Sequence, residues 1–223
     1  MATSLATHLI VLPGGGYSEH APNEAEPVAD WLTGLGIRAS VFRYPLLARH
    51  PEPLDALRNE IRRLREAGVE RVGLIGFSAG GHLAGLAALV PGAKATETVD
   101  FVLLGYPITS METETYRSAR LILLGEDATP ELRRATSLDA LVTSSSPPFF
   151  LWHTAEDPYV PPEHTYVLAS SLAAHRVPHT THVFAHGPHS LGLAQGASDA
   201  AAWTTLAASW ITEQSDTRPA EPN

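Results

Sequence analysis

The chain has 223 residues, of which 44% are hydrophobic and 17% charged, and its formal net charge is −9. This length is sufficient for one sizeable core, and the composition is that of a globular protein rather than a disordered or fibrous one. The negative charge opposes contact with phosphate backbones, so nucleic acid is excluded as an expected partner. The chain contains no cysteine, which rules out disulfides, thiol nucleophiles and Cys-ligated metals.

The N-terminus lacks the basic region and the small-residue cleavage site that are typical of a signal peptide. The apolar run 9–12 ends at Pro13 and follows no basic region, so we expect a strand there and not a signal peptide. No apolar stretch approaches the roughly 20 residues that span a bilayer. We therefore expect a cytoplasmic protein with no membrane partner. Residues 214–223 are polar and contain proline, and we expect a disordered tail there after a single α/β domain at 1–213.

Short β-rich runs alternate with helical patterns along the chain. Leu54, Leu57, Ile61 and Leu64 show the spacing of a helix with one buried face. This alternation predicts a mainly parallel sheet of about six strands covered by helices on both faces, with ligands at the carboxyl ends of the strands. Residues 111–146 depart from the pattern and predict an irregular insertion, a small cap-like segment of short helices. The predicted strands are 8–12, 37–44, 69–77, 101–106, 149–153 and 180–185.

A G-x-S-x-G pattern stands where the third predicted strand meets a helix. It runs from Gly76 to Gly80 and has Ser78 at its centre. In a strand–turn–helix context this pattern is typical of a nucleophile elbow, with small residues on either side so that strand and helix can approach. The N–H of Ala79, at the start of the helix, is then a donor to a developing oxyanion. The pattern does not match a phosphate loop, because no lysine follows the last glycine.

A triglycine loop, Pro13 to Tyr17, follows the first predicted strand. Glycines let the backbone approach a substrate carbonyl and direct N–H groups at it, as the HGGG-type loop of hydrolases does. Pro13 stands where that motif has histidine. We expect Gly15 and Gly16 to form an oxyanion hole together with Ala79.

A serine nucleophile needs a base, and the base needs a carboxylate to orient it. Asp157 follows the fifth predicted strand and precedes a proline turn, which favours it as the acid over its neighbour Glu156. His189 lies in the loop after the last predicted strand and is the candidate base, with His186 as its competitor. The chain order Ser, Asp, His is that of the α/β-hydrolases.

No close cluster of histidines and carboxylates has the spacing of metal ligands, so we expect neither a metal nor another cofactor. Four further side chains are candidates for lining a substrate pocket, although each is equally compatible with ordinary packing. They are Tyr17, Tyr106, Met111 and Tyr159.

Six blocks together resemble the acetyl-xylan-esterase-like branch of the α/β-hydrolases, the xylanase-associated esterases and lipases. They are PGGGY (13–17), VFRYP (41–45), GFSAGGHLAG (76–85), LGYPI (104–108), SPPFFLWHTAEDPYVP (146–161) and HVFAHGPHSLGLA (182–194). The resemblance covers nearly the whole chain, and the order and spacing of the blocks are more specific than any single block. It implies an α/β-hydrolase fold with Ser78, Asp157 and His189 as the triad and Gly15, Gly16 and Ala79 as the oxyanion hole.

The chain departs from this family at two points. Two strands that usually precede the triglycine loop are expected to be missing, and serine stands at Ser190, where the family often has glycine. The resemblance implies hydrolysis of a small-molecule ester substrate with a short acyl chain, acetylated sugars among them, through an acyl-enzyme intermediate. Two alternatives remain open from the sequence: an amidase of the same fold, similar to the arylformamidases, and an inactive hydrolase-fold binding protein.

Overall fold

A computed structural model describes residues 7–113, 117–197 and 199–216 of the chain. Within these residues six strands form one parallel sheet in the order β2-β1-β3-β4-β5-β6. The fold predicted from the strand–helix alternation is therefore confirmed. The strands are β1 (Thr7–Leu12), β2 (Arg38–Val41), β3 (Arg71–Phe77), β4 (Phe101–Gly105), β5 (Phe149–Thr154) and β6 (His179–Phe184).

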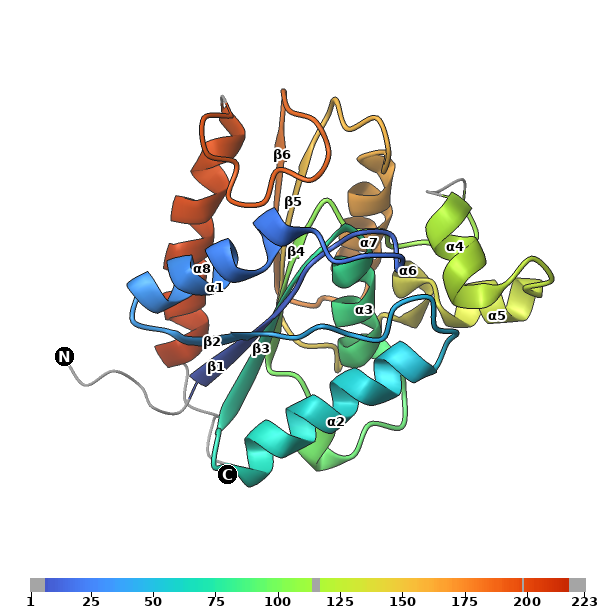
Figure 1. Ribbon diagram of the computed structural model, residues 1–223, viewed down its shortest axis with the longest axis horizontal. Helices are drawn as coiled ribbons and strands as arrows, with labels where there is room; N and C mark the ends of the chain where they lie inside the picture. Colours follow the sequence, from blue (N-terminus) through green and yellow to red (C-terminus); the bar gives the residue numbers. More distant parts are fainter. Residues whose placement is uncertain (1–6, 114–116, 198, 217–223) are drawn as a thin grey trace.

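Helices cover both faces of the sheet (Figure 1). On one face lie α1 (Glu26–Gly34) and α8 (Trp203–Asp216), and on the other lie α2 (Glu52–Glu66), α3 (Ser78–Leu89) and α7 (Glu163–Ala174). In the part of the chain that is described, no helix combines the length and the apolar composition of a bilayer-crossing segment.

The described part of the segment between β4 and β5 contains three short helices. They are α4 (Arg117–Leu124), α5 (Pro130–Ala135) and α6 (Leu138–Leu141). Figure 1 shows α4 and α5 at the outer edge of the molecule, on the opposite side from α1 and α8. The described residues also include three short 3-10 turns: η1 (Pro22–Glu24), η2 (Ala95–Glu97) and η3 (Asp199–Ala202).

The observed elements differ from the predicted ones mainly at their ends. The second strand is shorter than predicted because β2 is an edge strand, paired with β1 only over residues 38–41. The third begins at Arg71, since the N–H of Val69 still bonds to Leu64 at the end of α2. At the C-terminus α8 includes residues 214–216 of the expected tail, and residues 217–223 lie outside the described part of the chain.

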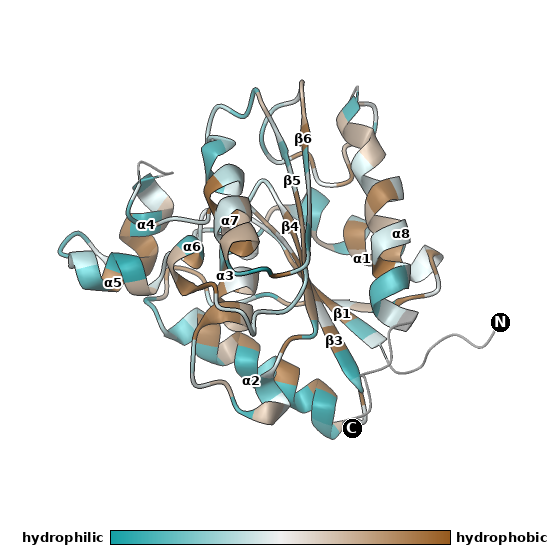
Figure 2. Ribbon diagram, turned by 180° about the vertical axis from the view of Figure 1, so that it is seen from behind, coloured by the Kyte–Doolittle hydropathy of each residue, from teal (hydrophilic) through white to brown (hydrophobic). Residues whose placement is uncertain are grey.

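The core consists of two apolar layers, one on each face of the sheet. On β3, Val72 and Leu74 belong to the layer beneath α2 and α3, whereas Ile75 and Phe77 belong to the layer beneath α1 and α8. Burial on both faces explains why this strand is apolar along its whole length. Helix α2 buries one face only, and Figure 2 shows hydrophobic and hydrophilic residues alternating along it. Helix α3 is buried almost throughout, because α2 and α6 pack over it.

All strands of the sheet point in one direction, so their carboxyl ends share one edge. The loops that follow β1, β3, β5 and β6 therefore meet there. These four loops carry the triglycine segment, Ser78, Asp157 and His189, which are widely separated in the sequence.

Candidate active site

Ser78 occupies a sharp turn between β3 and α3. Its φ angle of 51° lies in the left-handed region, which a residue with a side chain adopts only when its surroundings impose it. The turn requires close contact with the first strand, because a Cβ atom on Gly80 would lie 2.2 Å from the carbonyl oxygen of Leu12. The fold thus raises Ser78 above the sheet edge, at the N-terminus of α3.

His189 connects Ser78 to Asp157. Its Nε2 atom lies 2.9 Å from the Ser78 hydroxyl oxygen, and its Nδ1 atom lies 2.5 Å from Oδ2 of Asp157. A carboxylate only accepts hydrogen bonds, so Nδ1 carries the proton and Nε2 is free to accept the serine proton. The structure therefore brings together the three residues predicted as nucleophile, acid and base.

The carboxylate of Asp157 is held in place on both oxygens. Oδ1 accepts the backbone N–H groups of Tyr159, at 2.9 Å, and Val160, at 3.0 Å. Oδ2, besides facing His189, lies 3.3 Å from Nε2 of the buried His153. Burial alone would raise the pKa of Asp157, but the hydrogen bonds from His153, His189 and Val160 outweigh it and hold this pKa well below its usual value. Asp157 is therefore ionised at neutral pH.

The triglycine loop lies beside the nucleophile. Gly15 has a φ angle of 118°, which strongly favours glycine, and its carbonyl oxygen accepts the N–H groups of Ser18 and Glu19 in a tight turn. Gly15 and Gly16 line the same pocket as Ser78. Ala79 is buried in the first turn of α3, where N–H groups have no intrahelical acceptor.

A small, open pocket of about 180 Å³ surrounds the Ser78 hydroxyl. Among the described residues, none from 111–146 lines it. Tyr159 lies on its wall with 60% of its surface exposed. The lining residues are Gly15, Gly16, Ser18, Glu19, Ser78, Tyr159, His189 and Ser190.

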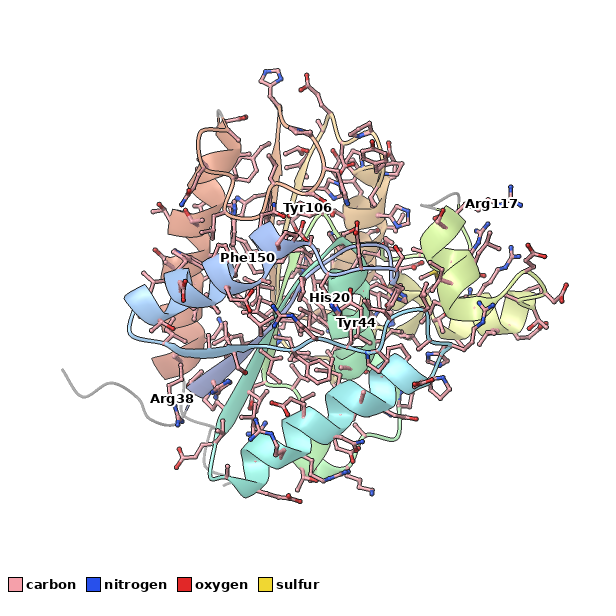
Figure 3. The ribbon with its side chains drawn as sticks, viewed as in Figure 1. His20, Arg38, Tyr44, Tyr106, Arg117 and Phe150 are labelled. Atoms are coloured by element: carbon pink, nitrogen blue, oxygen red, sulfur yellow. The ribbon has the colours of Figure 1, made fainter. Side chains whose placement is uncertain are left out.

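The structure places the other predicted pocket residues inside the fold. Tyr17, Tyr106 and Met111 are fully buried and are not among the residues that line the pocket. The Tyr17 hydroxyl donates to Nδ1 of His82, which donates from Nε2 to a backbone carbonyl. Figure 3 shows Tyr106 within the molecule, near the carboxyl ends of the strands. The expectation is thus corrected at these three positions, where the side chain is used in packing and internal hydrogen bonds.

The rival acid and the rival base contact each other instead of Ser78. Oε1 of Glu156 lies 3.0 Å from Nδ1 of His186, and both side chains are exposed. The hydrogen bond between them, together with the attraction of their charges, lowers the pKa of Glu156 and raises that of His186. In the described ranges, no group of three or more His, Asp or Glu side chains is placed to hold a metal ion.

One functional candidate had no signal in the sequence. Glu24, in η1, is fully buried beneath the site and accepts hydrogen bonds from the Gly14 N–H and the Tyr106 hydroxyl. A glutamate in a polar loop is ordinarily exposed, and only the folded chain shows that Glu24 turns inward.

The chain is similar to several known proteins. The model of the BD-FAE family matches residues 58–172. An acetyl ester-xyloside bifunctional hydrolase from Caldicellulosiruptor lactoaceticus is 37% identical with a TM-score of 0.87, covering 93% of this chain and 82% of its own. A carboxylesterase from Lactobacillus plantarum WCFS1 is 28% identical with a TM-score of 0.80. The match covers 96% of this chain and 88% of the carboxylesterase. Endo-1,4-beta-xylanase B of Butyrivibrio fibrisolvens is 30% identical over 83% of this chain and 32% of its own length. The chain spans about a third of the length of the curated relatives that it matches.

Proposed function

The chain belongs to the BD-FAE family of α/β-hydrolases, and from this premise we propose that it is a serine esterase acting on short-chain carboxylic esters. The observation that carries the proposal is the continuous hydrogen-bonded chain from Ser78 through His189 to Asp157. A strained, nearly buried serine within 2.9 Å of an oriented imidazole is the arrangement that activates a hydroxyl for attack.

In the acylation step, Nε2 of His189 takes the proton of the Ser78 hydroxyl as Oγ forms a bond to the ester carbonyl carbon. The carbonyl oxygen becomes an oxyanion, which the N–H groups of Gly15, Gly16 and Ala79 stabilise. The imidazolium then gives its proton to the alcohol oxygen as the C–O bond breaks. The alcohol leaves, and the acyl group remains on Ser78.

Deacylation repeats these steps with water as the nucleophile. His189 removes a proton from water as the water oxygen bonds to the acyl carbon, and then returns that proton to the Ser78 oxygen as the acid leaves. Asp157 stays ionised throughout, fixes the tautomer of His189 and stabilises the imidazolium that forms in each half of the reaction. No metal or organic cofactor is needed for these steps.

The form of the pocket supports a short acyl group and a polar alcohol. Its volume of about 180 Å³ is below the roughly 300–1,000 Å³ of pockets for drug-sized ligands. Ser18, Glu19 and Ser190 give its rim hydrogen-bonding groups suited to sugar hydroxyls, and the exposed ring of Tyr159 offers a face on which a sugar can pack. The names of the relatives, a xylanase and an acetyl ester-xyloside hydrolase, also favour acetylated sugars as substrates.

The test compares wild type, Ser78→Ala and Ser144→Ala on p-nitrophenyl acetate, butyrate and octanoate. Ser144 is an exposed serine in the loop before β5 and provides a matched control. We expect wild type and Ser144→Ala to hydrolyse acetate fastest and octanoate slowest, and Ser78→Ala to fall to background. A fluorophosphonate probe should label wild type and leave Ser78→Ala unlabelled.

Three results would contradict the proposal. Labelling of Ser78→Ala at the wild-type rate would place the nucleophile elsewhere. Wild type that neither turns over any of the three esters nor reacts with the probe would favour a hydrolase-fold binding protein, whereas labelling without ester turnover would favour an amidase.

A further inference from the structure

Glu24 is a buried carboxylate that the triad mechanism does not use. It lies in η1, after the triglycine loop, and none of its surface is exposed. Oε2 accepts the N–H of Gly14 at 2.7 Å, and Oε1 accepts the hydroxyl of Tyr106 at 2.8 Å. One end of the carboxylate therefore holds the loop of the predicted oxyanion hole.

The other end of the carboxylate leads to the loop that carries the base. The Tyr106 hydroxyl oxygen accepts the N–H of Gly192 at 2.8 Å, three residues beyond His189. Since Gly192 donates to this oxygen, the hydroxyl proton of Tyr106 is available for Glu24. The ring of Tyr106 also packs edge-on against the imidazole of His189, with 4.9 Å between the ring centroids.

A second bond ties η1 to the same loop. The side-chain amide of Asn23 donates to the carbonyl oxygen of Ser190, directly after His189, at 2.8 Å. Ser190 itself has a φ angle of 60°, in the left-handed region, so this part of the loop depends on its neighbours for its conformation. Consecutive residues of η1 thus contact both loops that flank Ser78.

We propose that Glu24 is a positioning residue of the esterase, whose carboxylate fixes the oxyanion loop and the His189 loop relative to each other across Ser78. This inference rests on the proposed function. It assigns Glu24 no contact with substrate: Glu24 acts through Gly14 on one side and through Tyr106 on the other.

The energetics of burial indicate that the contribution lies in geometry more than in stability. Removing a carboxylate from water is costly, and hydrogen bonds offset that cost only in part. Burial raises the pKa of Glu24, and the hydrogen bonds from Tyr106 and Gly14 oppose this shift. The Ser190 hydroxyl also donates to this carboxylate. An uncharged isostere in this place would relieve the cost of desolvation, but it would lose an acceptor for one of these donors.

The first test is Glu24→Gln, with Glu97→Gln as its control. The glutamine amide turns an NH₂ group toward a site where only donors approach, so at least one of the hydrogen bonds to the carboxylate is lost or rearranged. We expect kcat to fall 10- to 100-fold, as misplacement of catalytic groups by about 1 Å can do. KM should stay within about twofold of the wild-type value.

Glu97, the control, is also a buried carboxylate and pairs with Arg62. It lies in η2, before β4, and so away from the carboxyl edge of the sheet. Its substitution should leave kcat unchanged.

Two further readouts separate positioning from mere structural support. Active sites are counted with a fluorophosphonate probe, so that kcat is expressed per reactive serine, and the melting temperature is measured in parallel. We expect the loss in kcat per site to occur with little change in melting temperature. A lower melting temperature with unchanged kcat per site would overturn the proposal, as would wild-type kcat in Glu24→Gln.

Tyr106→Phe tests the same connection between the two loops from the side of the His189 loop. It also provides a test of the proposal if Glu24→Gln does not fold. It keeps the ring against His189 but removes the hydroxyl that joins Glu24 to Gly192. We expect a similar fall in kcat, and the double variant should be no worse than the more impaired single variant, since both break one connection. Wild-type kcat in Tyr106→Phe, or full additivity in the double variant, would contradict the inference.

Ser78→Ala distinguishes failure of this inference from failure of the proposed function. If Ser78→Ala keeps the esterase activity, the proposed function is wrong and the positioning role falls with it. If Ser78→Ala is inactive while Glu24→Gln and Tyr106→Phe match wild type, only the positioning role is wrong.

Discussion

Oε1 of Glu156 lies 3.0 Å from Nδ1 of His186, and the two side chains form an exposed ion pair at the rim of the carboxyl edge. Glu156 directly precedes Asp157, and His186 stands three residues before His189. Exposed ion pairs of this kind contribute little to stability. The chain therefore contains, next to its proposed acid and base, a second carboxylate–histidine pair that makes no contact with Ser78.

This neighbouring pair provides the control for the first prediction, the substitution Asp157→Asn. An amide cannot select the tautomer of His189 that accepts the Ser78 proton, and we expect kcat on p-nitrophenyl acetate to fall by about 10³–10⁴. Glu156→Gln should stay within about twofold of wild type. Equal losses in the two variants would show that the acid has been assigned to the wrong residue.

The sequence was sufficient to identify the candidate triad for a topological reason. Loops that follow strands of one parallel sheet meet at the same edge, so Ser78, Asp157 and His189 could be placed together without knowledge of any distance. The proline turn after it then favoured Asp157 over Glu156, and a place after Gly187 and Pro188, in the loop before the final helix, favoured His189 over His186.

The directions of individual side chains in the loops could not be predicted in this way. Tyr17 lies in the loop after the first predicted strand, and Tyr106 is the last residue of the fourth. Their φ angles are 63° and 36°, and both side chains are buried inside the fold. A single residue with a left-handed backbone leaves no periodic pattern in the sequence, so its side-chain direction cannot be predicted from periodicity. Glu24 was missed for a related reason: buried carboxylates depend on donors from distant segments, here Gly14 and Tyr106.

The second prediction concerns stability at low pH. Burial lowers the pKa of His82 to about 4, whereas histidine in an unfolded chain titrates near 6.5. Between these values the unfolded state binds more protons than the folded state, so the free energy of unfolding decreases as the pH falls from about 6.5 toward 4. His82 alone should account for a loss of about 2 kcal/mol between pH 7.5 and pH 5.

Urea unfolding at both pH values measures this effect. His82→Gln lacks the titrating group, so its loss between pH 7.5 and pH 5 should be smaller than that of wild type by about 2 kcal/mol, whatever its stability at pH 7.5. His175→Gln, at an exposed position after α7, should keep the wild-type dependence. An unchanged pH dependence in His82→Gln would mean that this histidine is already charged in the folded protein or is accessible to water.

The third prediction tests the close approach that shapes the elbow. A Cβ atom on Gly80 would lie 2.2 Å from the carbonyl oxygen of Leu12 and 2.4 Å from that of Pro13. Backbone atoms cannot move aside as a flexible side chain can, so Gly80→Ala should lower the free energy of unfolding by about 3 kcal/mol. Gly34→Ala, at the end of α1 and with no atom within 4 Å of the new Cβ, should raise it by about 0.5 kcal/mol. Equal stabilities of the two variants would contradict the packing described for the elbow.

The last prediction concerns the alcohol part of the substrate. Tyr159 lies on the pocket wall, with its ring centroid 6.0 Å from that of His189, while its backbone N–H holds Asp157. Tyr159→Ala removes the ring and keeps the N–H, so the triad should remain intact. If a sugar packs on this ring, kcat/KM for an acetylated xylo-oligosaccharide should fall about three- to tenfold, since such contacts contribute about 1 kcal/mol. The kcat/KM for ethyl acetate, whose alcohol is too small to reach the ring, should stay within about twofold of wild type.

Tyr166→Ala, at an exposed position on α7 outside the pocket, should change neither value. A similar loss on both substrates would indicate that the ring supports the triad, and no loss on either would mean that the sugar does not contact Tyr159.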